Sequence, residues 1–286
     1  MSSRPTSCSA ESALPGQPVE ADVTIALPNR EPVHARTYGA KQAGVISPLV
    51  LHFHGGTFVC GDLDNGRFVA QMLASVGAVV VSLAYPLAPK HPFPEPIEVG
   101  YAVLEWLYKN RLKLAGKGAP LYLAGEEAGG NLAAAVAMIA RDRGHPPLAG
   151  QILISPMLDP CSGTQSLREA CGDAVECRWA AGWQEYLSRP ADAVHPYAVP
   201  SASIRLSQIA PTLVLVGQDD PMRDEALTYA RRLREAGIPV TSNVLCTAQN
   251  WPEALSGPGA DDCTACLDAA KQHVREFFSA SNAPPI

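Results

Sequence analysis

Short apolar runs, separated by turn residues, recur along the whole chain. Several of them lack an alternation of apolar and polar positions, which is typical of strands buried on both faces of a parallel sheet. Helical patterns lie between these runs, and several end at or near glycine, a common helix stop. The predicted strands are residues 23–27, 49–53, 78–85, 120–125, 150–155, 211–217 and 240–246, and the predicted helices are 68–77, 99–110, 132–144, 224–237 and 265–278.

The alternation of strand and helix predicts one doubly wound α/β sheet, with residues 1–18 as a loose tail and residues 19–286 as a single domain. Residues 159–200 interrupt the alternation and carry Trp179, Trp183 and Tyr186 at helical spacing, on one helix face. This insertion is either a small satellite core or an aromatic lid over the ligand-binding end of the sheet, and the two readings are compatible.

Charge and cysteine content narrow the function classes. The net charge is −6 with both signs interspersed, so nothing indicates nucleic acid or a membrane surface as a partner. The first residues lack the apolar segment of a secretory signal, which favours a cytoplasmic protein with reduced thiols. The pair Cys263 and Cys266 has no second ligand pair, so we expect ordinary thiols, no metal site and no cofactor.

The stretch LYLAGEEAGGNLAAAVAM, residues 121–138, carries the chemistry. An apolar run enters a turn between Gly125 and Gly129, and an alanine-rich helix leaves it. A turn of this shape presents a serine nucleophile in some hydrolases. Here the residue at the apex is Glu127.

Four ordered motifs make the chain resemble the hormone-sensitive-lipase-like branch of the α/β-hydrolase fold, from about residue 33 onward. They are HFHGGTFVCGD (52–62), YPLAPKHPFP (85–94), GEEAGGNLAAA (125–135) and GQDDPMRDEALTYARRLREAG (217–237). The resemblance implies a doubly wound, mostly parallel sheet of eight strands, flanked by helices and carrying a small helical lid.

The resemblance also implies site residues. The positions of the family's serine, aspartate and histidine fall on Glu127, Asp220 and Gln249, so two members of the triad are replaced. His195 is the only plausible substitute for the histidine. The oxyanion hole falls on the backbone N–H groups of Gly56, Thr57 and Ala128, with Thr57 in place of a family glycine. Candidate substrate contacts are His54, Trp179, Trp183, Tyr186 and Trp251.

Three functions stay open for such a site. Loss of a triad serine or histidine costs on the order of a million-fold in turnover, so we expect a non-hydrolytic enzyme that uses Glu127 as general acid or base. The expected reaction is cyclisation, elimination or isomerisation of a hydrophobic small molecule. The alternatives are a pseudoesterase that only binds its ligand, and a weak esterase. A homodimer is a further expectation, because family members often associate through an edge strand or the last helix.

Overall fold

The structure is a computed structural model that describes residues 19–42, 44–160, 163–171, 177–245 and 264–281. The predicted tail, residues 1–18, lies outside these residues, as do Gln249 and Trp251.

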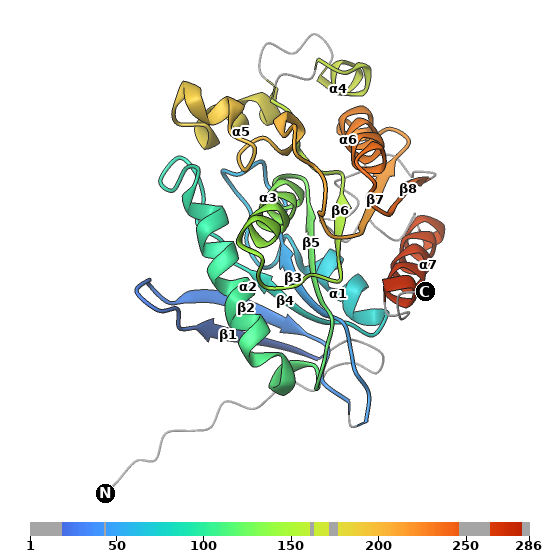
Figure 1. Ribbon diagram of the computed structural model, residues 1–286. Helices are drawn as coiled ribbons and strands as arrows, with labels where there is room; N and C mark the ends of the chain where they lie inside the picture. Colours follow the sequence, from blue (N-terminus) through green and yellow to red (C-terminus); the bar gives the residue numbers. More distant parts are fainter. Residues whose placement is uncertain (1–18, 43, 161–162, 172–176, 246–263, 282–286) are drawn as a thin grey trace, which may run out of the picture.

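A single sheet of eight strands runs through the described chain (Figure 1). Its spatial order is β1-β2-β4-β3-β5-β6-β7-β8. The strands β1 and β2 are antiparallel to their neighbours. The other six strands, β3 to β8, are parallel to one another. The strands are β1 (Glu20–Ile25), β2 (Val33–Tyr38), β3 (Leu49–Phe53), β4 (Val79–Leu83), β5 (Leu121–Glu126), β6 (Gly150–Ile154), β7 (Thr212–Gly217) and β8 (Val240–Leu245).

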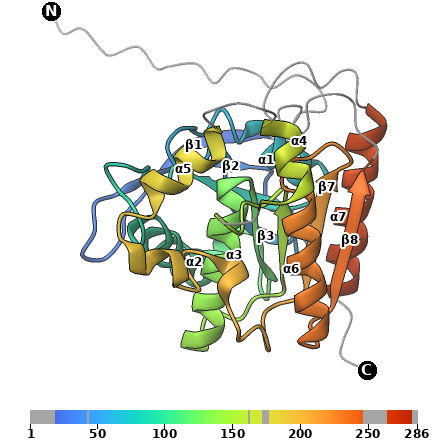
Figure 2. The same cartoon turned by 90° about the horizontal axis from the view of Figure 1, so that it is seen from above.

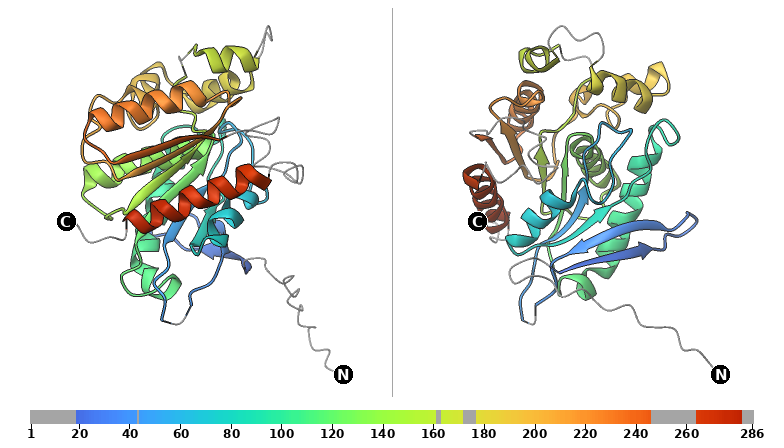
Figure 3. Two further views of the ribbon diagram at one scale, coloured as in Figure 1. Left: turned by 90° about the vertical axis from the view of Figure 1, so that its right-hand side faces the viewer. Right: turned by 180° about the vertical axis from the view of Figure 1, so that it is seen from behind.

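Helices cover both faces of this sheet. On one face, α1 (Arg67–Ser75) and α7 (Thr264–Ser281) pack through Val69, Leu73 and Val274 (Figure 3). The other face carries α2 (Glu95–Leu114), α3 (Ala128–Arg143) and α6 (Arg223–Glu235), of which α2 and α3 lie side by side (Figure 2). The predicted doubly wound, mostly parallel eight-stranded sheet is therefore confirmed.

The burial of each strand explains why the sequence predicted most of the strands and missed β2. Every residue of β3, β4, β5, β6 and β7 is buried, which accounts for their unbroken apolar runs. The strand β2, with the sequence VHARTY, is only partly buried and pairs with the edge strand β1. Its polar residues hide the strand from a search for apolar runs.

The insertion contains α4 (Gln165–Cys171), α5 (Arg178–Tyr186) and the 3₁₀ turn η1 (Pro190–Val194), and another 3₁₀ turn, η2 (Pro200–Ala202), follows it. In Figure 1, α4 and α5 lie at the top of the molecule, beyond the sheet. Side chains at the start of α6 hold this region: Asp224 accepts the Ser166 N–H at 3.0 Å and Glu225 accepts the Leu158 N–H at 2.7 Å. The limits of the lid at 159 and 200 stay a prediction.

Candidate active site

The turn between β5 and α3 holds Glu127 in a backbone conformation that side chains rarely adopt. Its φ is +48° and its ψ is −117°. The turn fits only because glycines flank it: a Cβ on Gly129 would lie 2.1 Å from the Phe53 carbonyl oxygen, and one on Gly125 would lie 2.2 Å from the Gly129 oxygen. The start of α3 is thus pressed against the end of β3, where the loop with Gly56 begins.

The Glu127 carboxylate lies between this loop and the lid. Its Oε2 accepts the Gly56 N–H at 3.0 Å, and its Oε1 accepts Arg178 Nη2 at 3.3 Å and Trp179 Nε1 at 3.4 Å. The Glu127 side chain is only 12% exposed. The structure therefore brings together Glu127, Gly56 and Trp179 from the predicted site.

Thr57 and Ala128, which are also predicted to form the oxyanion hole, directly follow Gly56 and Glu127 in the chain. Thr57 follows Gly56 with a φ of +52°, and Phe58 follows with a φ of +69°. Two successive side chains in the left-handed region are strained, so the surrounding packing must hold the loop in this shape. Ala128 is the first residue of α3 and is fully buried beside Glu127.

A buried histidine–glutamate pair anchors the loop from below. Glu126 accepts the Gly55 N–H at 3.1 Å through Oε1 and His52 Nε2–H at 2.7 Å through Oε2. The other ring nitrogen of His52, Nδ1, lies 2.9 Å from the Ser82 hydroxyl oxygen, at hydrogen-bond distance. Because all three side chains are buried, these hydrogen bonds are shielded from water and fix the loop relative to the sheet.

His54, a predicted substrate contact, lies buried inside this loop. Its side chain is 1% exposed, its Nδ1 lies 2.7 Å from the Gly55 oxygen, and its ring stacks on Tyr85 with centroids 4.3 Å apart. The Tyr85 hydroxyl in turn donates to the His54 oxygen at 2.9 Å. Burial lowers the pKa of His54 and raises that of Tyr85 well above its usual value.

Asp220 lies in the loop that follows β7 and is fully buried. Its carboxylate accepts the Ser155 hydroxyl and, at 2.8 Å, the Met222 N–H. Ser155 directly follows β6 and has a φ of +45°. The ring of His195 lies against Phe93 and Tyr197, whereas Gln249 lies outside the described residues.

The aromatic residues of the lid separate into two roles. Phe58 stacks on Tyr186 with centroids 4.0 Å apart and meets Trp183 at 4.9 Å, so these rings form a satellite core between the loop and α5. Trp179, one turn earlier on α5, instead reaches Glu127. The helix touches the loop directly, because a Cβ on Gly182 would lie 2.2 Å from the Thr57 oxygen. The packing of these rings fits the predicted satellite core, whereas a lid over a ligand site stays a prediction.

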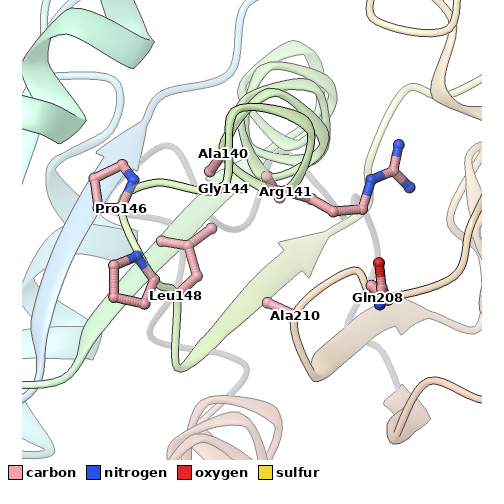
Figure 4. A pocket seen from close by; sticks show the side chains of 9 residues that line it. Ala140, Arg141, Gly144, Pro146, Leu148, Gln208 and Ala210 are labelled. Carbon is pink, nitrogen blue, oxygen red and sulfur yellow. The ribbon is translucent and has the colours of Figure 1, made fainter.

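Glu127 is not among the lining residues of two cavities in the described part of the molecule. One of about 220 Å³ lies at the C-terminal end of α3, lined by Arg141, Pro146 and Leu148 among others (Figure 4). The other, of about 390 Å³, lies beside α5 and is lined by Trp183, Leu187 and Pro190 among others. Since α3 is roughly 24 Å long and Glu127 caps its N-terminus, the first cavity is remote from the turn. The pocket that the sequence predicts at Glu127 stays a prediction.

The cysteines differ in part from the expectation of ordinary thiols. Cys60 and Cys177 are free, but Cys266 is disulfide-bonded. Within the described ranges no three His, Cys, Asp or Glu side chains form a group that could hold a metal. Among those ranges no helix is long and apolar enough to span a bilayer. The cytoplasmic location stays a prediction.

Three residues contribute to the site although the sequence analysis did not predict them: Arg178, Ser155 and Glu126. Arg178 precedes Trp179, so its place at the start of a lid helix was the available signal. Ser155 ends a predicted strand next to the strand that leads into Glu127, and parallel strands end at the same edge of a sheet. Glu126 adjoins the apex residue.

Comparison with known proteins identifies the class. The family described as alpha/beta hydrolase fold matches residues 50–248, and the chain belongs to that family. Esterase LipI of Mycobacterium tuberculosis is 34% identical over 198 residues, covering 68% of this chain and 62% of that protein. The arylesterase of Saccharolobus solfataricus is 30% identical over 198 residues, covering 68% of this chain and 64% of that protein.

Solved structures agree with this membership. A hyperthermophilic esterase from the archaeon Pyrobaculum calidifontis superposes with a TM-score of 0.80 at 33% identity, covering 92% of this chain and 88% of that one. The chain spans 62% of the length of the first curated relatives that it matches. The family resemblance to hormone-sensitive-lipase-like carboxylesterases is thus shown at the level of fold and family.

The same relatives correct the expected reaction. A non-hydrolytic cyclase, lyase or isomerase was expected from the carboxylate at the turn. That expectation is wrong: the relatives at 30–34% identity are named as esterases, carboxylesterases and an acetyl-hydrolase. The prediction inferred the reaction from one side chain, that of Glu127. The rest of the chain matches a family whose named relatives are esterases.

Proposed function

We propose that this chain is a pseudoesterase: an esterase-family protein whose Glu127 closes the hydrolytic centre, leaving a site that binds a small molecule without cleaving it. The observation that carries the proposal is the hydrogen bond from Gly56 N–H to Glu127 Oε2 at 3.0 Å. By the family resemblance, that N–H is a donor that receives the substrate's carbonyl oxygen.

Glu127 blocks hydrolysis in two ways. It stands at the position of the nucleophilic serine, so the hydroxyl that attacks an ester is missing. Its own carboxylate also occupies a donor of the oxyanion hole, and an ester oxygen must compete with a group that is always present at high local concentration. The oxyanion hole alone supplies roughly a thousand-fold or more over water, and here that contribution is also suppressed.

The other hydrogen bonds around the site are compatible with ligand binding. The loop carrying Gly56 is anchored by Glu126 and His52, and the buried Asp220 is held by Ser155 and the Met222 N–H. Gln249, at the family's histidine position, has a side-chain amide that accepts no proton at neutral pH. These features support a rigid site that lacks the groups for acyl transfer. The ligand is a small molecule with an apolar part, as the aromatic lid favours.

Slow ester hydrolysis is the second candidate, favoured by the names of the relatives and by the retained Asp220. The two candidates differ in whether the turn forms a covalent bond with an ester mimic. A fluorophosphonate reacts with the activated serine of an esterase and leaves a stable adduct. After incubation with an excess of the reagent, intact-mass and peptide analysis should find no stoichiometric adduct on any serine of the chain.

Arylesterase from Saccharolobus solfataricus, treated in parallel, controls for reagent quality. An adduct on the turn of this chain, or a stoichiometric adduct on any serine that also responds to an ester substrate, would reject the pseudoesterase proposal.

A further inference from the structure

An isoleucine lies fully exposed on the turn that connects η2 to β7. Ile204 is 99% exposed, which makes it the most exposed large apolar side chain of the described residues. The residues around it are buried: Ser203, directly before it, is 4% exposed, and Leu206, two positions after it, is 5% exposed. The turn is thus anchored in the protein, whereas the isoleucine itself contacts solvent.

Two arginine side chains hold the backbone on either side of Ile204. Arg141 of α3 donates through Nη1 to the Arg205 oxygen at 2.6 Å, and Arg232 of α6 donates through Nη2 to the Ser203 oxygen at 2.6 Å. The Arg141 side chain is only 8% exposed, so its hydrogen bond is largely shielded from water. An apolar side chain on a turn that is fixed in this way loses little entropy when a partner covers it.

The cavity at the C-terminal end of α3 lies beside this turn, because Arg141 lines it as well. In Figure 4, Arg141 and Gln208 lie on one side of the cavity, and Pro146 and Leu148 lie on the other. Gly144 and Gln208 are exposed, so the cavity opens to solvent. A cavity of roughly 150 Å³ holds a benzene molecule, so this one, of about 220 Å³, has room for an isoleucine side chain.

The charges of the turn and of the cavity are complementary. Arg205, which follows Ile204, has a side chain that is 74% exposed. The cavity adjoins the C-terminal end of α3, where Gly144 is the cap, and the end of a helix carries a partial negative charge. The arginines of the last turn, Arg141 and Arg143, are already paired with acidic side chains. A positive side chain that enters with an isoleucine is therefore attracted to this end of the helix.

We propose that this end of the molecule is an interface between two copies of the chain, in which Ile204 of each copy enters the cavity of the other. The isoleucine and the cavity occur on the same surface, so one twofold axis satisfies both contacts at once, as in other isologous dimers. The interface lies at the opposite end of α3 from Glu127, so it does not depend on the state of the hydrolytic centre. It also differs from the edge strand and the last helix, through which a homodimer was expected.

Sedimentation equilibrium on the full chain, at concentrations up to about 300 µM, measures this association. We expect a monomer–dimer equilibrium. Ile204→Asp should weaken dimerisation by at least about tenfold, as expected for an apolar anchor at the centre of an interface, whereas Ile204→Leu should keep the dimer. Arg205→Gln should weaken it by about two- to fivefold, because an exposed charge contributes less.

A mixture of two variants tests the exchange of isoleucines between copies. Ala210 lines the cavity, so Ala210→Phe should fill it and abolish dimerisation. An equimolar mixture of Ile204→Asp and Ala210→Phe chains should form dimers again, because the isoleucine of the second chain still fits the open cavity of the first. Val194→Asp is the matched control: Val194 is another apolar side chain, 75% exposed on η1, and its replacement should leave dimerisation unchanged.

Three results would overturn the proposal. One is a chain that stays monomeric up to about 300 µM. Another is a dimer that Ile204→Asp leaves as strong as before, which is the result expected for pairing through the edge strand β8. The third is a mixture of folded variants, checked by circular dichroism and thermal melting, that forms no more dimer than its two components. Where Ala210→Phe does not fold, Ile204→Asp decides the question by itself.

Discussion

Replacing Glu127 by alanine should expose an anion site that the protein normally fills itself. The substitution keeps the Cβ and hence the strain of the positive φ, but it removes the carboxylate from Gly56, Arg178 and Trp179. A hydrogen bond to a charged group is worth about 1.5–3 kcal/mol. The Arg178 pair adds about 1 kcal/mol or less, because Arg178 is half exposed.

The expected loss of unfolding free energy is therefore about 2–3 kcal/mol. For a domain of this size each kcal/mol shifts the melting temperature by roughly 2–4 °C, so the variant should melt about 5–10 °C lower. Formate, a free carboxylate, should then bind the vacated donors. At ten times its dissociation constant it restores about 1.4 kcal/mol, roughly half of the loss.

Thermal melting with formate against chloride at equal ionic strength measures this rescue. Wild-type protein should show no formate-specific gain, because its donors are filled. Glu98→Ala removes another ion-paired glutamate, one that contacts Arg143 on the surface, and should show none either. If Glu127→Ala melts like the wild type and formate acts no differently from chloride, the carboxylate does not occupy these donors, and the reasoning fails.

Three other outcomes follow from the same contacts. Glu127→Ser and Gln249→His should each leave ester turnover at background, whereas the double variant should exceed the sum of the two by at least about tenfold, because triad members act as a unit. Burial lowers the pKa of His54 below its ordinary 6.5, so at acid pH the unfolded chain binds a proton that the folded chain does not. The free energy of unfolding, measured by denaturant titration, should therefore fall as the pH drops below about 6.5, by at most about 1.4 kcal/mol per pH unit, and His54→Gln should flatten that slope. Gly182→Ala should lower stability by about 1–3 kcal/mol in a melting experiment, since its Cβ would lie 2.2 Å from a carbonyl oxygen of the Gly56 loop.

The fold could be predicted because its central strands are buried on both faces. Their apolar runs stand out in the sequence, whereas β2, on the antiparallel side, carries polar residues on its partly exposed face and was missed. The meeting of Gly56 and Glu127 was also accessible, because their strands β3 and β5 are parallel neighbours that end at the same edge.

Contacts that depend on the lid could not be predicted. Nothing in the local pattern says that Arg178 reaches Glu127 across a sequence separation of 51 residues. The buried position of His54 depends on its stacking contact with Tyr85, which lies 31 residues later in the chain. The reaction was predicted wrongly because one side chain was given more weight than the surrounding esterase frame.

The turnover of a short activated ester by the full wild-type chain tests the central claim most directly. If Glu127 closes the hydrolytic centre, hydrolysis of 4-nitrophenyl acetate should not exceed that by an equal concentration of Glu127→Gln protein, with both far below the ordinary enzyme range. A turnover of about 1 per second or more that Glu127→Gln abolishes would contradict the account and make this chain a working esterase.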